Sequence, residues 1–210
     1  MIYLALAILY LLILDRPTFQ LLKLPLVQHL FGAALCFLMV LWQLKGQLPE
    51  SPPVHFLGVT TLVIVLGLRL SLLLVPLALL IPPPVLSLVN NTQISIDELQ
   101  LWQWLAVAVA VIQSYLVLLA SQKWLPRQLF VVIFVGGFFN SILSSVTYLL
   151  LQALGYSWLG TAPNLTSDYL LITPLLAFPE GLLNGMALTM LLVYRPEWLK
   201  HSLWHELPRP

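Results

Sequence analysis

One acidic side chain lies alone in a long apolar run near the carboxyl end of the chain. Glu180 is the only acidic residue between positions 175 and 192. An ionisable group in such a segment is costly to bury, and it usually has a polar partner, a water-filled cavity or a function. On a helix, Asn184 shares its face, while Gly181 and Gly185 permit another helix to approach closely. Glu180 therefore either lines a pathway or is protonated or hydrogen-bonded within a packing face.

Candidate partners for this carboxylate lie in another apolar segment, at residues 127–154. Asn140 and Ser144 are polar residues of that segment, together with further serines. Such side chains can line a pocket, and they also join neighbouring membrane helices by hydrogen bonds. Asn140, Asn184 and Ser144 are therefore the possible polar residues of a pocket around Glu180.

Two histidines are candidate metal ligands. His55 opens an apolar run, and a neutral imidazole there suits a borderline ion such as nickel, cobalt or zinc. It is alternatively a histidine at the start of a helix, among lipid headgroups. His29 lies about one turn inside the segment 25–44, and a straight helix that rises about 1.5 Å per residue keeps it far from His55. We expect His29 to be hydrogen-bonded within the bundle, although it and Glu180 stay candidates for a shared metal site.

Several kinds of chemistry have no residues to support them. The chain has no glycine-rich phosphate-binding loop, no serine-histidine-acid arrangement and no paired-carboxylate motif, so we expect no enzymatic activity and no ATP hydrolysis. Its single cysteine, Cys36, cannot form an internal disulfide, and we expect it to be a small core residue. A net charge of +1 gives no indication of nucleic acid as a partner.

The composition predicts a membrane protein. Of the 210 residues, 60% are hydrophobic and 8% are charged, whereas a soluble domain has about 25% charged residues. Charged residues, prolines and glycines divide the chain into apolar segments, which must be helices because lipid cannot satisfy open backbone groups. The seven segments are 1–14, 25–44, 54–67, 70–82, 98–121, 127–154 and 168–194.

Two of these segments are short and meet at Gly67. A single helix through both would bury Arg69 at mid-depth of the bilayer, which is costly. We therefore expect two short helices joined by a tight turn that carries Arg69.

Basic residues predict the orientation, because they gather in cytoplasmic loops. With seven crossings, Lys45 lies on one side and the other eight Lys and Arg residues lie on the opposite side. The predicted fold is an all-α, polytopic bundle of about seven helices in the inner or plasma membrane, with the amino terminus outside. It is a single domain over residues 1–210 with a short cytoplasmic tail at 195–210. The eight residues are Arg16, Lys23, Arg69, Lys123, Arg127, Arg195, Lys200 and Arg209.

Two separated stretches resemble one transporter family. Residues 53–67 read Pro-Val-His-Phe-Leu-Gly-Val-Thr-Thr-Leu-Val-Ile-Val-Leu-Gly. This is similar to the segment that carries a metal-binding histidine in the cobalt and nickel permease (substrate-binding) subunits of energy-coupling-factor (ECF) transporters. Residues 180–185 (Glu-Gly-Leu-Leu-Asn-Gly) and 194–199 (Tyr-Arg-Pro-Glu-Trp-Leu) resemble the glutamate-glycine helix and Arg-Pro-Glu-Leu ending of the same subunits. The motifs are short, and the resemblance covers roughly half of the chain.

The resemblance implies a subunit that captures a divalent metal ion from the outer side and works with a transmembrane partner and two ATPases. It would make His55 the internal ligand. In the family, a histidine at the second position folds back and binds the ion as well, but this chain begins Met1-Ile2-Tyr3. A square-planar nickel or cobalt site cannot form here in that way. Either Glu180 or His29 is recruited, or this is a divergent branch that has lost metal capture.

Three functions therefore stay open. The first, which we favour, is a non-enzymatic permease subunit for uptake of a divalent transition metal, with the lipid bilayer, other membrane subunits and ATPase subunits as partners. The second is a membrane metalloprotein or oxidoreductase subunit in which His29, His55 and Glu180 hold an ion. The third is an accessory subunit of a larger membrane complex, whose glycine-rich helices form contact faces.

Overall fold

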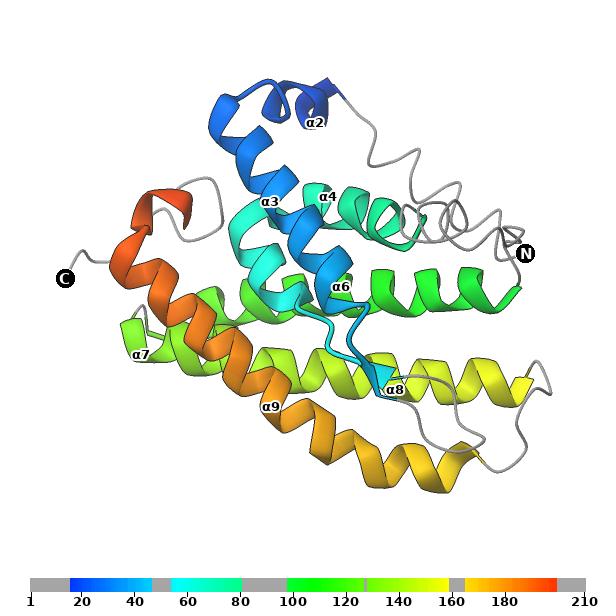
Figure 1. The fold of residues 1–210 in the computed structure, drawn as a ribbon. Coiled ribbons are helices and arrows are strands. Elements are labelled where there is room, and N and C mark those ends of the chain that lie inside the picture. The colour runs from blue at the N-terminus through cyan, green and yellow to red at the C-terminus, as the bar shows by residue number, and fades with distance from the viewer. Residues whose placement is uncertain (1–15, 47–53, 81–97, 127, 159–164, 200–210) are drawn as a thin grey trace.

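The computed structural model describes residues 16–46, 54–80, 98–126, 128–158 and 165–199, and these are mostly helical (Figure 1). The helices are α2 (Arg16–Leu21), α3 (Pro25–Leu41), α4 (Val59–Leu80), α6 (Glu98–Trp124), α7 (Leu129–Val131), α8 (Asn140–Trp158) and α9 (Leu165–Tyr194). Between α7 and α8 lies the π-helix η1 (Val132–Phe139), and η2 (Pro196–Leu199) is a short 3₁₀ helix. The strands β1 (Lys45–Gly46) and β2 (Val54–His55) pair antiparallel, with Lys45 opposite His55.

Four helical stretches are long and apolar enough to cross a membrane. This confirms an all-α helical membrane protein, whereas the count of seven spans and the orientation of the termini stay predictions. The segment 1–14 lies outside the described residues, and α3 has 17 residues, fewer than the roughly 20 of a perpendicular span. The four stretches are Val59–Leu79, Leu101–Trp124, Leu129–Trp158 and Leu171–Tyr194.

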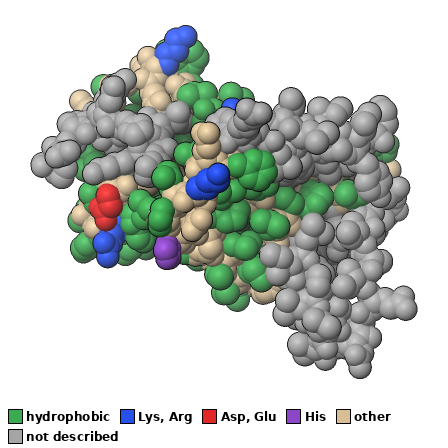
Figure 2. Space-filling view, turned by 90° about the horizontal axis from the view of Figure 1, so that it is seen from above, with side chains coloured by type: hydrophobic (Ala, Val, Ile, Leu, Met, Phe, Trp, Pro, Cys, Tyr) green, Lys and Arg blue, Asp and Glu red, His purple; other side chains and the backbone are tan. Residues whose placement is uncertain are grey.

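The described surface is largely apolar. On the described part of one face, Figure 2 shows many hydrophobic side chains with a few charged groups among them. On α8 and α9, Leu154, Leu171 and Leu175 are among many large apolar side chains that are exposed. A soluble monomer rarely exposes such extended apolar surface, so this surface suits contact with lipid chains.

Helix α4 changes direction at Gly67. This residue has φ 77° and ψ 173°, whereas the residues around it are helical. Figure 1 shows α4 as two short runs that meet at an angle. The predicted turn at Gly67 is confirmed, and Arg69 beyond it is exposed. Two helical runs joined in this way keep the cation out of the core, as the cost of burying it requires.

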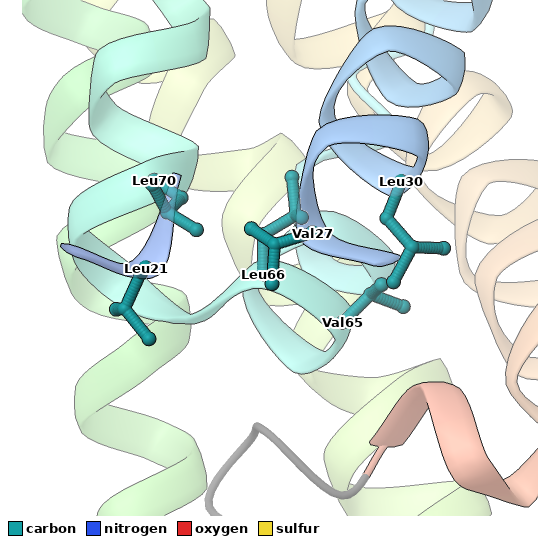
Figure 3. Close-up of a pocket in the computed structure, with 6 residues that line it drawn as sticks. All are labelled: Leu21, Val27, Leu30, Val65, Leu66 and Leu70. Atoms are coloured by element: carbon teal, nitrogen blue, oxygen red, sulfur yellow. The ribbon is translucent and has the colours of Figure 1, made fainter. Parts of the chain in front are cut away.

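A small pocket lies beside this turn (Figure 3). It is formed where α2 and α3 meet the two runs of α4. The side chains that line it are all aliphatic, so it offers no polar side chain to an ion or a polar substrate. The lining residues are Leu21, Val27, Leu30, Val65, Leu66 and Leu70.

Replacing Gly67 with alanine is expected to lower the free energy of unfolding by about 1–3 kcal/mol, because its backbone conformation is one that only glycine adopts without strain. A Cβ at this position would meet nothing within 4 Å, so the loss would come from the backbone alone. Chemical unfolding of the purified protein in detergent measures it. The matched control is Gly32→Ala on α3, which also meets no atom within 4 Å. There, alanine should be neutral or stabilising, and equal losses at both positions would contradict the strain.

Glycines bring α9 close to η1 and α8. A Cβ on Gly137 of η1 would lie 3.3 Å from Cα of Gly185, and a Cβ on Gly181 would lie 2.8 Å from Cγ1 of Ile142. Such contacts leave no room for larger side chains. The predicted role of Gly181 and Gly185 in close helix approach is confirmed, and this approach places Glu180 inside the bundle.

Candidate functional site

Glu180 is buried, with 2% of its surface exposed, where α9 crosses the start of α4. Its Oε1 accepts a hydrogen bond from the backbone N–H of Gly58 at 2.7 Å, and its Oε2 accepts one from Leu57 N–H at 2.9 Å. Asn184 donates from Nδ2 to the same Oε1 at 2.8 Å. Both carboxylate oxygens are therefore held by donors of the protein itself.

Asn184 continues the contact between α9 and the start of α4 about one turn further along α4. Its Oδ1 accepts hydrogen bonds from Thr61 N at 3.1 Å and from Thr61 Oγ1 at 2.7 Å. The first N–H groups of a helix have no partner within the helix, and their end of the helix carries a partial positive charge. Side chains of α9 thus provide the cap of α4, while Gly58 has the positive φ of 67° that lets the chain turn into the helix.

His55 is buried, with 2% of its surface exposed, at the end of β2. Its Nδ1 lies 3.1 Å from the carbonyl oxygen of Phe56, which can only accept, so Nδ1 carries the proton. Its Nε2 lies 3.1 Å from Tyr148 Oη and 3.1 Å from Gln103 Nε2. Because an amide nitrogen only donates, Nε2 is the acceptor in the neutral ring. The hydrogen bonds thus fix one tautomer, with the Nε2 lone pair facing α6 and α8.

Aromatic and amide groups enclose this imidazole. The centres of the Trp42 and Tyr148 rings each lie 5.5 Å from the centre of the His55 ring. Gln152 donates from Nε2 to Tyr148 Oη at 3.0 Å. The Gln152 Oε1 is buried without a hydrogen-bond partner among the described residues. The site consists of an imidazole, a phenol and two carboxamides, all of which are neutral donors or acceptors.

His55 and the backbone groups that Glu180 binds lie in one short segment of the chain. Glu180 binds the backbone two and three residues after His55. His29 lies apart from them on α3, where it is exposed and its Nδ1 is 2.6 Å from Pro25 O. The prediction that His29 is hydrogen-bonded within the bundle was therefore wrong, because its bond is to its own helix on the exposed face of α3.

The other predicted pocket residues, Asn140 and Ser144, are buried on α8. Asn140 donates from Nδ2 to Ser114 O and to Ser114 Oγ, both at 3.0 Å, and so joins α8 to α6. Ser141 donates to the backbone oxygen of Glu180 at 3.3 Å. The Ser144 hydroxyl is buried without a hydrogen-bond partner among the described residues. These residues line the polar centre of the bundle, but the carboxylate of Glu180 is held by Asn184 and backbone groups.

Within the described part of the chain, no three His, Cys, Asp or Glu side chains come together in a group that could hold a metal ion. Glu180 would have to release backbone N–H groups in order to coordinate one. Of the two histidines in the described residues, His55 is the buried one, and its ring orientation is set by the hydrogen bond of Nδ1, as is common for metal-binding histidines.

Comparison of the chain with protein-family models, curated proteins and solved structures found no match. What the protein does must therefore be inferred from its buried polar side chains.

The sequence reasoning missed three residues around His55. Gln103, Tyr148 and Gln152 complete the polar site. A signal for two of them exists, because Tyr148 and Gln152 follow Ser144 at intervals of four residues. That spacing places Ser144, Tyr148 and Gln152 on one face of a helix. A polar stripe on an apolar helix indicates a buried contact.

Proposed function

We propose that the protein is a membrane-embedded, non-enzymatic substrate-binding subunit for uptake of a divalent transition-metal ion. His55 provides a nitrogen ligand from within the bundle. The subunit lies in the cell membrane and works with separate membrane and ATPase subunits, since the chain itself has no nucleotide-binding motif. Cobalt and nickel are the ions that the sequence resemblance implies, and zinc also suits an imidazole.

The observation that supports this proposal is the orientation of His55. Its Nδ1–H donates to Phe56 O, so the lone pair lies on Nε2, where it accepts from Tyr148 and Gln103, and an ion would have to displace these two groups. A histidine ligand normally has its second nitrogen fixed in this manner by a carbonyl or carboxylate.

Two alternatives have less support. A redox or catalytic metalloprotein needs several ligands at one place, and His29 is exposed on α3, away from Glu180. An accessory subunit with glycine-rich contact faces needs those glycines on its surface, but Gly137 and Gly185 are in contact with each other inside the bundle.

Replacing a residue that supports a metal ligand weakens metal binding roughly 10–100-fold. Replacing the ligand His55 itself with alanine is therefore expected to weaken Co²⁺ binding by more than that. Titration of the purified full chain with Co²⁺, followed by optical absorption, measures the affinity and the ligand field. His29→Ala is the matched control, because it removes an imidazole from the exposed side of α3. Equal binding by the two variants would exclude His55 as the ligand, and so would a wild-type chain that binds no Co²⁺, Ni²⁺ or Zn²⁺.

A further inference from the structure

One peptide group connects the two buried sites. The peptide between Phe56 and Leu57 offers its carbonyl oxygen to His55 Nδ1 at 3.1 Å and its N–H to Glu180 Oε2 at 2.9 Å. The described backbone has no cis peptide bond, so these two groups lie in one rigid plane and point in opposite directions within it. The carboxylate and the imidazole therefore hold the same plane from opposite directions.

The rest of this segment is fixed as well. Gly58 N–H donates to Glu180 Oε1, and Trp42 Nε1 donates to Leu57 O at 3.1 Å. Asn184 in turn holds the carboxylate through Oε1. The peptide plane at residues 56–57 can thus rotate only if several hydrogen bonds break together, and its orientation determines where the imidazole proton lies.

We infer that Glu180 is a positioning residue for ligand capture by His55, acting through the peptide between Phe56 and Leu57; this rests on the proposed function. A carboxylate that accepts a hydrogen bond from the peptide N–H polarises the peptide, and its carbonyl becomes a better acceptor for Nδ1–H. The proton then stays on Nδ1, and Nε2 keeps the lone pair that an ion would use once Tyr148 and Gln103 are displaced. In many metal sites, a carboxylate accepts a hydrogen bond directly from the ligand imidazole and so fixes its orientation. Here one peptide group lies between the Glu180 carboxylate and the His55 imidazole.

This assigns a different role to Glu180 from that of a metal ligand. As a ligand, it would have to give up the N–H donors of Leu57 and Gly58. As a positioning residue, it keeps them while the ion binds at Nε2 of His55. The two roles differ in what the Glu180→Gln variant does before any metal is added.

Glu180→Gln is the test, because glutamine has nearly the same shape but only one acceptor oxygen, and its amide N–H₂ would face a backbone N–H. In the metal-free full chain, the amide of Leu57 should exchange with solvent faster, and the ¹⁵N spectrum of His55 should lose the single Nδ1–H tautomer. With Co²⁺ as the probe, affinity should fall about 10–100-fold, with a changed absorption spectrum.

Three further variants make the result specific. Glu197→Gln is the matched control, since Glu197 is an exposed acid paired with Arg195, and it should leave both readouts unchanged. Glu180→Asp keeps two acceptor oxygens and should restore part of the affinity. Asn184→Ala, which removes only the support of Oε1, should give a smaller loss and stands in for Glu180→Gln if that variant does not fold.

The outcomes separate this inference from the proposed function. If Glu180→Gln changes the tautomer and the exchange of Leu57 but binds Co²⁺ like the wild type, the positioning role is wrong while His55 can still be a ligand. If the tautomer and exchange stay unchanged, the peptide link itself is wrong. If the wild type and His55→Ala bind Co²⁺ equally, the proposed function fails and the positioning role with it, whatever the metal-free spectra show.

Discussion

Replacing Glu180 with alanine is expected to lower the free energy of unfolding by about 3–5 kcal/mol. The variant leaves the N–H groups of Leu57 and Gly58 without acceptors in the interior of the bundle. Each buried donor that loses its partner costs about 1–3 kcal/mol. Asn184 Nδ2 loses one of its two acceptors at the same time. Chemical unfolding in detergent, followed by circular dichroism, measures the loss.

The control for this prediction is Glu197→Ala. Glu197 is 43% exposed in its side chain and lies 3.4 Å from Arg195, and an exposed ion pair contributes at most about 1 kcal/mol. A loss for Glu180→Ala no larger than that of Glu197→Ala would show that the buried carboxylate does not hold the start of α4.

Replacing Gly155 with alanine is expected to lower the free energy of unfolding by about 2–4 kcal/mol. A Cβ at this position would overlap the indole of Trp102, which lies directly against the glycine. The indole donates from Nε1 to Leu151 O at 2.6 Å and meets the Trp158 ring edge-on. Overpacking costs about 1–3 kcal/mol, and the displaced indole also loses a hydrogen bond of about 1 kcal/mol.

A double-mutant cycle checks the cause. In the background of Trp102→Ala, the space beside Gly155 is empty, so Gly155→Ala should be neutral or slightly stabilising there. If the loss is the same in both backgrounds, the collision with Trp102 is not its cause and the close contact of α6 with α8 at this glycine is wrong.

The sequence was sufficient for features that depend on local pattern. The isolation of Glu180 in an apolar run indicated a carboxylate with a polar partner or a function, and its spacing to Asn184 placed both side chains on one helix face. The structure joins them by a hydrogen bond of 2.8 Å. Gly67 between two short apolar runs indicated the turn in α4. In each case the residues that interact are close in the chain, so helix geometry alone brings them together.

The partners of Glu180 could not be predicted in this way. Its carboxylate binds backbone N–H groups of Leu57 and Gly58, more than a hundred positions earlier in the chain. Every residue except proline has such an N–H group, so no residue type marks those that are used. Asn140, predicted as a polar neighbour, instead joins α8 to Ser114 of α6. Which helix faces which is decided by the packing of the whole bundle.

The prediction for Cys36 was wrong, for a reason that is specific to membrane proteins. It was expected in the core because it lies in an apolar run, but it is exposed on α3. In a soluble protein, an apolar run predicts burial, since the outer surface must be polar. Where lipid forms the surroundings, the outer face is as apolar as the core, and composition cannot distinguish the two.

The two hydrogen bonds at Nε2 of His55 have a kinetic consequence. Tyr148 Oη and Gln103 Nε2 already occupy the side from which an incoming cation must approach the ring. Under the proposed function, binding of an ion at this nitrogen would be a substitution rather than a simple addition, because the phenol and the carboxamide would have to move aside first. The association rate would be governed by side-chain rearrangement and would level off at high ion concentration, whereas a preformed vacant cage would fill at a rate proportional to concentration.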